Sequence, residues 1–386
     1  MTFVARIPPG VSRPPAAVEP MRRLLALATA TALAACTVQQ QPQTGANAPL
    51  GRRTPVSQLP GWRQDNAAAA LSSFVTSCKA ILLMPPDSRL GGTGLAAARA
   101  GQAGLWQPAC TAAEAVAPND EAAARKFFES RFIAYAVPGQ ALITGYFEPE
   151  VRGSKNERPG YRVPLYAKPP TAALASLPRK AIDHGALYRK VPVTAYVTNP
   201  VDAFMLQIQG SGRILLPDGN ILRVGFDGQN GQPYTPIGLI LEQMGALKPD
   251  DVSYQSISAW LKSHPDQARS VMEQNARYVY LRPLGPLPQN EGAPGALGVP
   301  LTARRSTAID ESALPLGTPL YVATTDPVTG TAMDLLTVTQ DTGGGIHGAD
   351  RADIFFGAGP KAEQIAGSMR QPGRLYLLLP KPEPSS

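Results

Sequence analysis

Proline and glycine interrupt this chain too often to leave room for many long helices. The 386 residues include 40 prolines and 36 glycines. Proline lacks a backbone N–H, and glycine loses the most backbone entropy on folding, so both residue types break regular helices. A chain of this length can still bury a large core and, by size alone, can form two domains. We therefore expect loop-rich β structure rather than a helical bundle.

Short strands are predicted wherever apolar runs lie between turn residues. The first run covers 141 to 153, and the PDGN segment between 203 to 216 and 221 to 226 is typical of a hairpin turn. The simplest summary is an all-β barrel with helical decoration. The remaining predicted strands lie at 161 to 166, 278 to 284, 299 to 310, 319 to 324, 335 to 344 and 374 to 380.

Apolar residues at helical spacing predict a smaller set of helices. One of them is expected to begin with Thr235 as its N-cap and Pro236 in its first turn, and to end near Gly245. The other predicted helices cover 65 to 82 and 122 to 132, a pair within 253 to 275, and a short helix from Gly359 to Gly367.

The first 60 residues resemble an export signal followed by a tether. Residues 21 to 36 have a basic start, a short apolar stretch and small residues before Cys36. Their end resembles a bacterial lipobox, so we expect a signal peptide at 21 to 35, a lipidated Cys36, and a flexible tether over 36 to 60. Residues 1 to 20 then correspond to an over-extended gene start. Thr37 after the cysteine favours the periplasmic face of the outer membrane.

Cys78 and Cys110 are the two cysteines that remain after such processing. In an oxidising compartment an even pair favours a disulfide. Two independent buried thiols are the alternative, because sequence alone does not show that the two residues approach each other.

Charge and histidine content argue against two classes of function. The formal net charge is +7, but Lys and Arg are scattered, and no basic helix or zinc pattern accompanies them, so nucleic acid is not the expected partner. A polyanionic or carboxylate-bearing partner fits the charge as well. His184, His264 and His347 lie far apart in the sequence, so we expect neither a metal site nor a cofactor.

Residues 340 to 356 place three carboxylates around a glycine run. Asp353 precedes Ile354, Phe355 and Phe356, and an apolar environment raises a carboxyl pKa, which suits a general acid. Asp341 is either its catalytic neighbour or the cap of a turn, and Asp350 is expected to be solvated. The DTG triplet alone is also found in aspartic proteases, but a second copy is absent from the sequence.

Five segments closely resemble membrane-bound lytic murein transglycosylase A. The resemblance implies a mainly β chain with a few peripheral helices. It also implies a double-psi β-barrel catalytic domain, formed by 61 to 149 and 285 to 386, and an inserted β domain over 150 to 284, with a glycan strand in the groove between them. The segments are TGYFEP at 144 to 149, FMLQIQGSGRI at 204 to 214, GQPYTPIG at 231 to 238, QNARYVYLRP at 274 to 283 and DTGGGIHGADRADIFFG at 341 to 357.

The resemblance also implies the reaction. It is cleavage of the β-1,4 bond between N-acetylmuramic acid and N-acetylglucosamine, without water, to give a 1,6-anhydromuramoyl end. Asp353 lies at the position of the catalytic acid, and the same residue then acts as the base. Asp341 is its neighbour, where a negative charge would stabilise an oxocarbenium-like transition state.

Substrate contacts are expected around these two acids. Tyr146 and Phe147 are predicted to stack on sugar faces, and Arg213 to meet carboxylates of the stem peptides. Glu148 forms either a structural ion pair or a binding contact. Polar contacts are expected from Gln207, Gln209 and Ser211 along one strand and its turn, and from Thr342 and Gly343.

The expected partners are peptidoglycan glycan strands, the outer membrane through the lipid anchor, and murein synthases or scaffold proteins. A non-catalytic peptidoglycan-binding lipoprotein is the alternative. The sequence does not distinguish exo from endo action or fix the preferred stem peptide or the oligomeric state.

Overall fold

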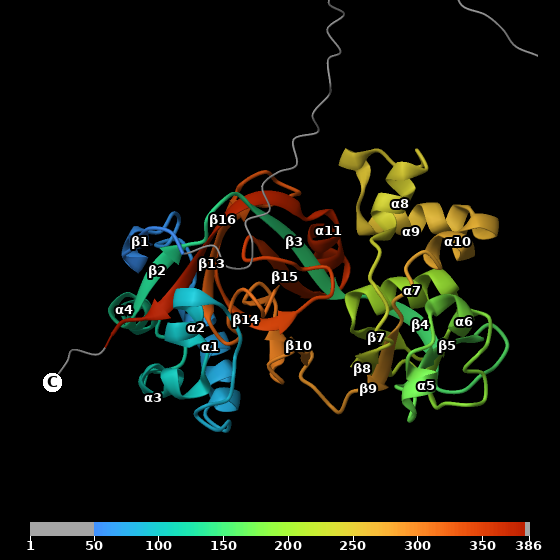
Figure 1. Cartoon of the computed structure of the whole chain (residues 1–386), viewed down its shortest axis with the longest axis horizontal. Coiled ribbons are helices and arrows are strands. Elements are labelled where there is room, and N and C mark those ends of the chain that lie inside the picture. Colours follow the sequence, from blue (N-terminus) through green and yellow to red (C-terminus); the bar gives the residue numbers. More distant parts are fainter. Residues whose placement is uncertain (1–49, 383–386) are drawn as a thin grey trace, which may run out of the picture. The chain divides into compact units, whose positions relative to one another are not determined.

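The computed structural model describes residues 50 to 382 and contains two principal β-sheets (Figure 1). The first has the strand order β1-β2-β16-β13-β14-β12-β15-β3, and an additional pairing of β16 with β3 closes six of its strands into a barrel. The barrel strands are β3 (Ala141–Glu148), β12 (Ser306–Ile309), β13 (Pro319–Thr325), β14 (Ala332–Thr342), β15 (Arg351–Ala358) and β16 (Arg370–Pro380), and β1 (Arg53–Thr54) and β2 (Phe132–Ala136) extend the sheet.

The register of the barrel brings two aspartates into one row. Strand β12 pairs with β14 on one side and with β15 on the other, and Ala308 is the Cα partner of both Asp341 and Asp353. On the far side of β15, Thr144 of β3 is the partner of Asp353. Residues in register across neighbouring strands point to the same face of a sheet. Asp341 and Asp353 therefore lie on the same face, two strand spacings or about 10 Å apart between their Cα atoms.

The second sheet is formed by the chain between β3 and the later barrel strands. Its order is β5-β6-β4-β7-β8-β9. The predicted hairpin is present, with Leu215 paired to Ile221 and Gly219 in the turn at φ 83°. The strands are β4 (Glu150–Ser154), β5 (Val163–Tyr166), β6 (Val193–Val197), β7 (Gly212–Leu215), β8 (Ile221–Gln229) and β9 (Val279–Pro283), and β10 (Glu291–Pro294) pairs separately with β11 (Pro300–Thr302).

The single strand predicted over 203 to 216 is wrong. Its first half is the helix α7 (Pro200–Gln209), and only Gly212–Leu215 is a strand. The Asn199 side chain caps the helix by accepting a hydrogen bond from the Val201 backbone N–H at 2.7 Å, and Gly210 ends it in the left-handed conformation. The apolar run fits a helix as well as a strand, and these end residues decide in favour of the helix.

Most predicted helices are present, with one correction at an end. The helix after GQPYT begins at Ile237, and Pro236, not Thr235, occupies its N-cap position without a side-chain hydrogen bond. The α-helices are α1 (Ala67–Ile81), α2 (Gly94–Ala100), α3 (Gln107–Glu114), α4 (Glu121–Arg131), α5 (Ala172–Ala175), α6 (Arg179–Asp183), α8 (Ile237–Gln243), α9 (Tyr254–Ser263), α10 (Pro265–Met272) and α11 (Pro360–Ser368), and the 3-10 turns are η1 (Val56–Gln58), η2 (Ala103–Trp106) and η3 (Pro249–Asp251).

Helices and strands contain similar numbers of residues within 50 to 382. The fold is therefore mixed α/β, and the expectation of a mainly β chain is wrong. The closed six-stranded barrel agrees with the expected barrel in outline. Within the described residues, none of the helices is both long enough and apolar enough to cross a membrane. The expected signal peptide and Cys36 lie outside the described residues.

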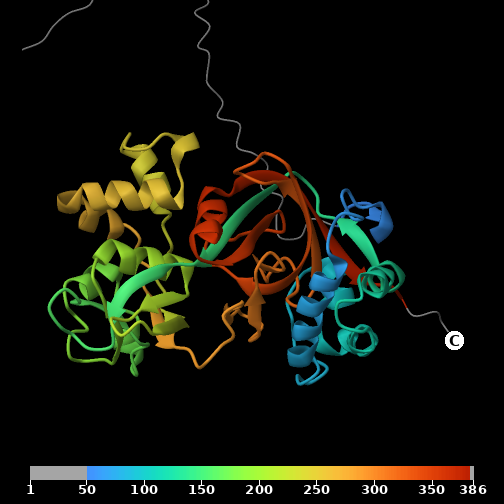
Figure 2. The same ribbon diagram turned by 180° about the vertical axis from the view of Figure 1, so that it is seen from behind.

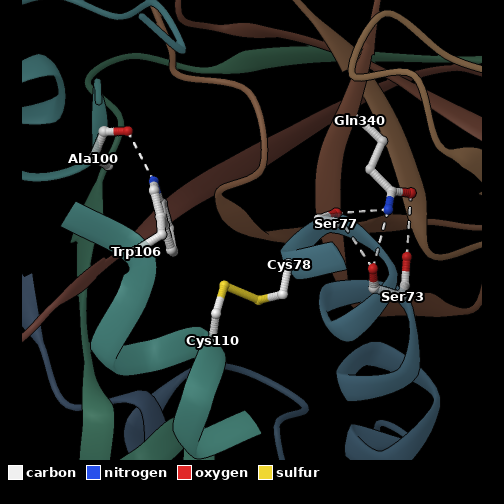
Figure 3. Close-up of a disulfide and its surroundings, with 7 residues drawn as sticks. All are labelled: Ser73, Ser77, Cys78, Ala100, Trp106, Cys110 and Gln340. Atoms are coloured by element: carbon white, nitrogen blue, oxygen red, sulfur yellow. Dashed lines mark hydrogen bonds between the residues drawn. A yellow bond between two sulfur atoms is a disulfide. The ribbon is translucent and has the colours of Figure 1, made fainter. Parts of the chain in front are cut away.

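The helical segment before β2 packs on the barrel and carries the predicted disulfide. Helix α1 lies against β14, as both ribbon views show (Figure 1 and Figure 2). Cys78 of α1 is bonded to Cys110 of α3, with their Cα atoms 5.3 Å apart (Figure 3). Beside them, the fully buried Phe74 ring is the centre of an aromatic cluster with Trp106, Phe127, Phe128 and Phe132.

Candidate active site

Asp353 lies in the middle of β15 with one carboxyl oxygen unsatisfied. The side chain is partly buried, and its Oδ1 atom is buried without a hydrogen-bond partner. Its neighbours Ala352 and Ile354 are fully buried. Burial and, to a smaller extent, the nearby Asp341 raise the pKa of Asp353, Arg351 and the Thr144 hydroxyl partly oppose them, and the net result is a pKa of about 6. A carboxyl group with this pKa keeps its proton in about a tenth of molecules at pH 7, against about one in a thousand for an ordinary aspartate, which suits a general acid.

Asp341 at the end of β14 is also partly buried, but both of its oxygens have hydrogen-bond donors. The Tyr146 hydroxyl donates to Oδ2 at 2.9 Å, and the Ala296 backbone N–H donates to Oδ1 at 3.0 Å. Burial raises the pKa of Asp341, and hydrogen bonds from the backbone of Thr342, from Tyr146 and from Ala296 oppose that rise. These donors orient the carboxyl group and favour its ionised form.

The two aromatic residues predicted to stack on sugars are both buried. Tyr146 is 8% exposed, its ring lies 5.2 Å from the Phe355 ring, and its hydroxyl serves Asp341. Burial raises the pKa of Tyr146 well above its usual value, so its hydroxyl remains a donor. Phe147 is 1% exposed and packs edge-on against Tyr254. The stacking prediction is therefore corrected: Tyr146 supports the acid pair and Phe147 belongs to the core.

The glycine loop after β14 brings the backbone close to two side chains that the sequence prediction did not single out. A Cβ atom at Gly344 would lie 1.8 Å from Arg277 Nη1, and one at Gly345 would lie 3.1 Å from the Tyr234 ring. Burial raises the pKa of Tyr234, and the charge of Asp353 raises it further. The Tyr234 hydroxyl therefore lies close enough to Asp353 for the two groups to interact electrostatically. Both residues lie in segments that carry the family resemblance, which is the signal that could have identified them.

At the start of this loop, Thr342 is the last residue of β14 and Gly343 follows it, and both are partly buried. Their expected substrate contacts remain predictions. Arg277 is held beside the loop by a hydrogen bond from Nε to the Gln232 carbonyl at 3.0 Å.

The predicted contacts along 207 to 213 are divided between a helix and a strand. Gln207 is buried in α7, and its Oε1 has no hydrogen-bond partner. Gln209 accepts a hydrogen bond from the Phe147 backbone N–H at 3.1 Å, and Ser211 is 7% exposed. Because Gln207 and Gln209 lie on a helix, the expectation that one strand carries these contacts is wrong.

Glu148 is the centre of a buried ion-pair cluster. Its carboxylate accepts from Arg213 Nε at 3.0 Å and from Arg223 Nη2 at 2.9 and 3.0 Å. The Ala293 backbone N–H donates to it at 2.7 Å. Of the two roles considered for Glu148, the structure shows the ion pair, and Arg213, predicted to meet the substrate, is committed to it.

Gln340 anchors the strand that carries Asp341. Its amide is fully buried, donates to the Ser77 hydroxyl at 2.7 Å and the Ser73 carbonyl at 3.0 Å, and accepts from the hydroxyls of Ser73 and Ser306. Figure 3 shows this amide facing the turn of α1 next to the disulfide. The pairing of β12 with β14 is irregular at this point, because Thr339 and Asp341 lie opposite Thr307 and Ala308 and Gln340 is the extra residue between them. The Gln340 amide bonds to α1, and the carboxyl group of the next residue, Asp341, bonds to Tyr146 and Ala296. The sequence prediction did not identify Gln340.

The barrel places a carboxyl group with a raised pKa, Asp353, on the same face as a hydrogen-bonded carboxyl group, Asp341. Asp353 can hold and release a proton, and Asp341 can place negative charge about two strands away. Over residues 50 to 382, there is no group of three or more His, Cys, Asp or Glu residues placed to hold a metal ion.

Comparison with known protein families assigns most of the described chain. Residues 142 to 282 match the MltA specific insert domain, and residues 305 to 379 match the 3D domain. A membrane-bound lytic murein transglycosylase A of Escherichia coli K12 is 34% identical over 252 residues, which cover 63% of this chain and 67% of the relative. The Vibrio cholerae protein of the same name is 29% identical over 248 residues, covering 62% of this chain and 66% of that protein.

Solved structures give the same result. A membrane-bound lytic murein transglycosylase from Agrobacterium tumefaciens superposes with a TM-score of 0.76 at 28% identity, covering 85% of this chain and 97% of that one. The Escherichia coli MltA structure with bound chitohexaose gives a TM-score of 0.66 at 27% identity, covering 89% and 95%. In sequence, in domain content and in fold, the chain belongs to the family of membrane-bound lytic murein transglycosylase A.

Proposed function

We propose that this protein is a peptidoglycan lytic transglycosylase with Asp353 as its single acid and base. The substrate bond is the β-1,4 linkage between N-acetylmuramic acid and N-acetylglucosamine, and the product carries a 1,6-anhydromuramoyl end. Family membership supports the class of reaction. The observation that carries the choice of acid is the buried, unpartnered Oδ1 of Asp353 together with its pKa of about 6.

The proton moves in two steps through one carboxyl group. Asp353 first donates its proton to the glycosidic oxygen, so that the leaving sugar departs as an alcohol. The resulting carboxylate then removes the proton from the C6 hydroxyl of the muramoyl residue, whose oxygen attacks C1. Water is not consumed, and the acid is regenerated. This scheme needs no second carboxylate at the separations of about 5 to 9.5 Å used by hydrolytic glycosidases.

Asp341 contributes negative charge to the same face. As the C1–O bond breaks, positive charge develops on the sugar ring, and a fixed carboxylate lowers the energy of that state. The Tyr146 hydroxyl and the Ala296 N–H hold the Asp341 carboxylate in position before substrate binds. Such preorganisation avoids reorienting the charge during the reaction.

The glycan is proposed to lie along the loop that begins at Thr342 and Gly343. Tyr234 and Arg277 extend toward this loop from the inserted region. They replace Tyr146 and Phe147 as the proposed aromatic and polar contacts to sugars. The chitohexaose bound in the Escherichia coli neighbour is itself a β-1,4-linked amino sugar chain, which supports a glycan ligand for this site.

We also propose three further features that the sequence and the family resemblance predict. They are the double-psi connection of the barrel, the domain boundaries at 61 to 149 with 285 to 386 and at 150 to 284, and attachment to the periplasmic face of the outer membrane through a lipidated Cys36. The description of the relatives as membrane-bound supports an envelope location.

Digestion of purified sacculi tests the proposal directly. Mass spectrometry of the released material is expected to show muropeptides with anhydromuramoyl ends, 18 mass units lighter than the products of hydrolysis. Release of hydrated ends only would replace the proposed reaction by hydrolysis. A protein that binds sacculi and releases nothing would favour the alternative, a peptidoglycan-binding lipoprotein.

A further inference from the structure

A cavity of about 420 Å³ lies in the six-stranded sheet, outside the acid site. Its lining comes from residues 155 to 196 and includes β5, which lies at one edge of that sheet (Figure 1). We call it the basic cavity, because Lys155, Arg162 and Arg189 lie around it with Glu157 as its single acidic residue. Its size falls within the roughly 300 to 1,000 Å³ range of small-ligand pockets.

The three cations of the basic cavity are exposed, and Lys155 also attracts Asp218, whose pKa it helps to lower. Among residues 50 to 382, no salt bridge within 4.0 Å involves Lys155, Arg162 or Arg189. The Arg189 guanidinium instead lies 5.2 Å from the centre of the Tyr188 ring, and the Tyr188 side chain is 51% exposed. By contrast, Arg213 and Arg223 in the same sheet are both bound to Glu148. The basic cavity therefore has charge available for a ligand.

The backbone conformation of Arg189, at the rim of the basic cavity, also supports a ligand site. Arg189 has φ 57°, a left-handed conformation that non-glycine residues rarely adopt. Such conformations persist where the surrounding structure enforces them, and they cluster at ligand sites. Here the conformation presents a cation and an adjacent exposed tyrosine together.

The floor of the basic cavity is apolar and aromatic. Tyr166 is 4% exposed and Val191 is 9% exposed, and both belong to the core cluster beneath the cavity. Tyr196 adds a partly buried ring to the lining. An apolar floor suits the flat amides and aliphatic parts of a peptide, whereas the cations suit its carboxylates and Glu157 suits an ammonium group.

We propose that the basic cavity is an accessory site for a short peptide in which carboxylates outnumber amines. This inference rests on the proposed function, because the peptides attached to the muramoyl residues of peptidoglycan have this chemistry. With the glycan in the acid site, a stem peptide of the same polymer or of a neighbouring strand would fill the basic cavity. The site would then hold the enzyme on peptide-bearing murein and not on bare glycan.

Binding of a defined peptide tests the assignment. The probe is N-acetyl-L-Ala-γ-D-Glu-meso-diaminopimelate, with three carboxylates and one ammonium group, titrated into the full chain by calorimetry. We expect the combined variant Lys155→Gln, Arg162→Gln and Arg189→Gln to weaken binding at least tenfold. The matched control, Arg52→Gln, Arg63→Gln and Lys248→Gln, removes the same charges from exposed positions outside the cavity and should change the Kd less than twofold.

Two further measurements test which charged groups of the peptide the basic cavity recognises. Glu157→Gln should weaken binding of the probe but not of an analogue without the ammonium group. Equal affinity for the cavity variant and the control, or for the probe and its methyl esters, would overturn the proposal. Displacement of the probe by inorganic pyrophosphate at far lower concentration than by free peptide would assign the cavity to phosphate instead.

Cleavage assays separate this inference from the proposed function. The cavity variant should cleave peptide-free glycan at the wild-type rate and peptide-bearing murein more slowly at low substrate concentration. If the wild type cleaves neither substrate, the proposed function fails, while the calorimetry still decides whether the basic cavity binds the peptide.

Discussion

Glu148 and Asp353 lie on neighbouring strands, and each is a buried carboxyl group with arginine nearby. Glu148 meets two guanidinium groups and a backbone N–H, which together give both of its carboxylate oxygens hydrogen-bond donors. Asp353 has an unpartnered oxygen, and the effect of burial on its pKa exceeds that of Arg351. A buried carboxylate whose oxygens are all paired stabilises the fold, whereas a buried carboxyl group with an unpaired oxygen has a raised pKa and can act as a proton donor.

The largest expected effect is the loss of activity in Asp353→Asn. The amide cannot donate or accept the transferred proton, and general acid and base catalysis each contribute about 10² to 10⁴ in rate. We expect release of anhydromuropeptides to fall at least about 10³-fold.

The same variant is expected to be more stable than wild type at neutral pH. The pKa of Asp353 is raised in the folded state, so the stabilising effect of its protonated form is lost as pH rises from about 4 through about 6. The loss is of order 3 kcal/mol for a shift of two units. Thermal denaturation at pH 4 and pH 7.5 measures this difference. If Asp353→Asn were less stable than wild type at both pH values, Asp353 would be a structural carboxylate like Glu148.

Glu148→Gln should show the opposite pattern. Removing the carboxylate leaves Arg213 and Arg223 buried without a counter-charge, at a cost of about 3 to 5 kcal/mol. We expect a lower urea midpoint and, for the folded fraction, activity within a few-fold of wild type. Asp202→Asn is the control, because its pair with Lys262 is partly exposed and should contribute less than about 1 kcal/mol. If Glu148→Gln were as stable as wild type, the ion pairs of Glu148 would not stabilise the fold as proposed.

Loss of the disulfide comes next in size. Cys78 and Cys110 close a loop across 32 positions, and replacing both by alanine should cost about 2 to 4 kcal/mol. The effect should match that of reducing the wild-type protein, as measured by denaturation with and without reductant. A further effect of reductant on the double variant would show that the stabilisation arises elsewhere.

Gln340→Leu should have a smaller effect that reaches the site. The hydroxyls of Ser73, Ser77 and Ser306 lose a buried partner, at a cost of about 1 to 3 kcal/mol. Because β14 also carries Asp341, we expect a few-fold lower kcat with little change in KM.

Thr339→Val is the matched comparison for Gln340→Leu. It removes a buried hydroxyl from the same strand, but that hydroxyl bonds to Pro315 and Thr318 rather than to α1. Equal kcat in the two variants at equal stability would show that Gln340 does not position Asp341.

The sequence predicted elements more reliably than it predicted contacts. Barrel strands were recognisable because each is an apolar run between turn residues, and Asp341 and Asp353 were identifiable within a single loop and strand. The segment 203 to 216 failed because its apolar run fits both a helix and a strand, and Asn199 and Gly210 at the helix ends decided the outcome.

Long-range partners could not be predicted in the same way. The amide of Gln340 meets Ser73 across 267 positions, and no local pattern encodes that pairing. Tyr146 was predicted to stack on a sugar but is buried and bonded to Asp341, because sequence spacing does not show whether a ring faces solvent or another strand. Its burial against Phe355 is set by the pairing of β3 with β15.

The titration of Asp353 tests the central claim most directly. Carbonyl-carbon NMR of aspartate-labelled protein, assigned by comparison with Asp353→Asn, reports the protonation of this one carboxyl group. We predict a midpoint near pH 6, with kcat/KM falling tenfold per pH unit above it as the acid loses its proton. A midpoint near 4, the value of an ordinary exposed aspartate, would contradict the assignment of Asp353 as the proton donor.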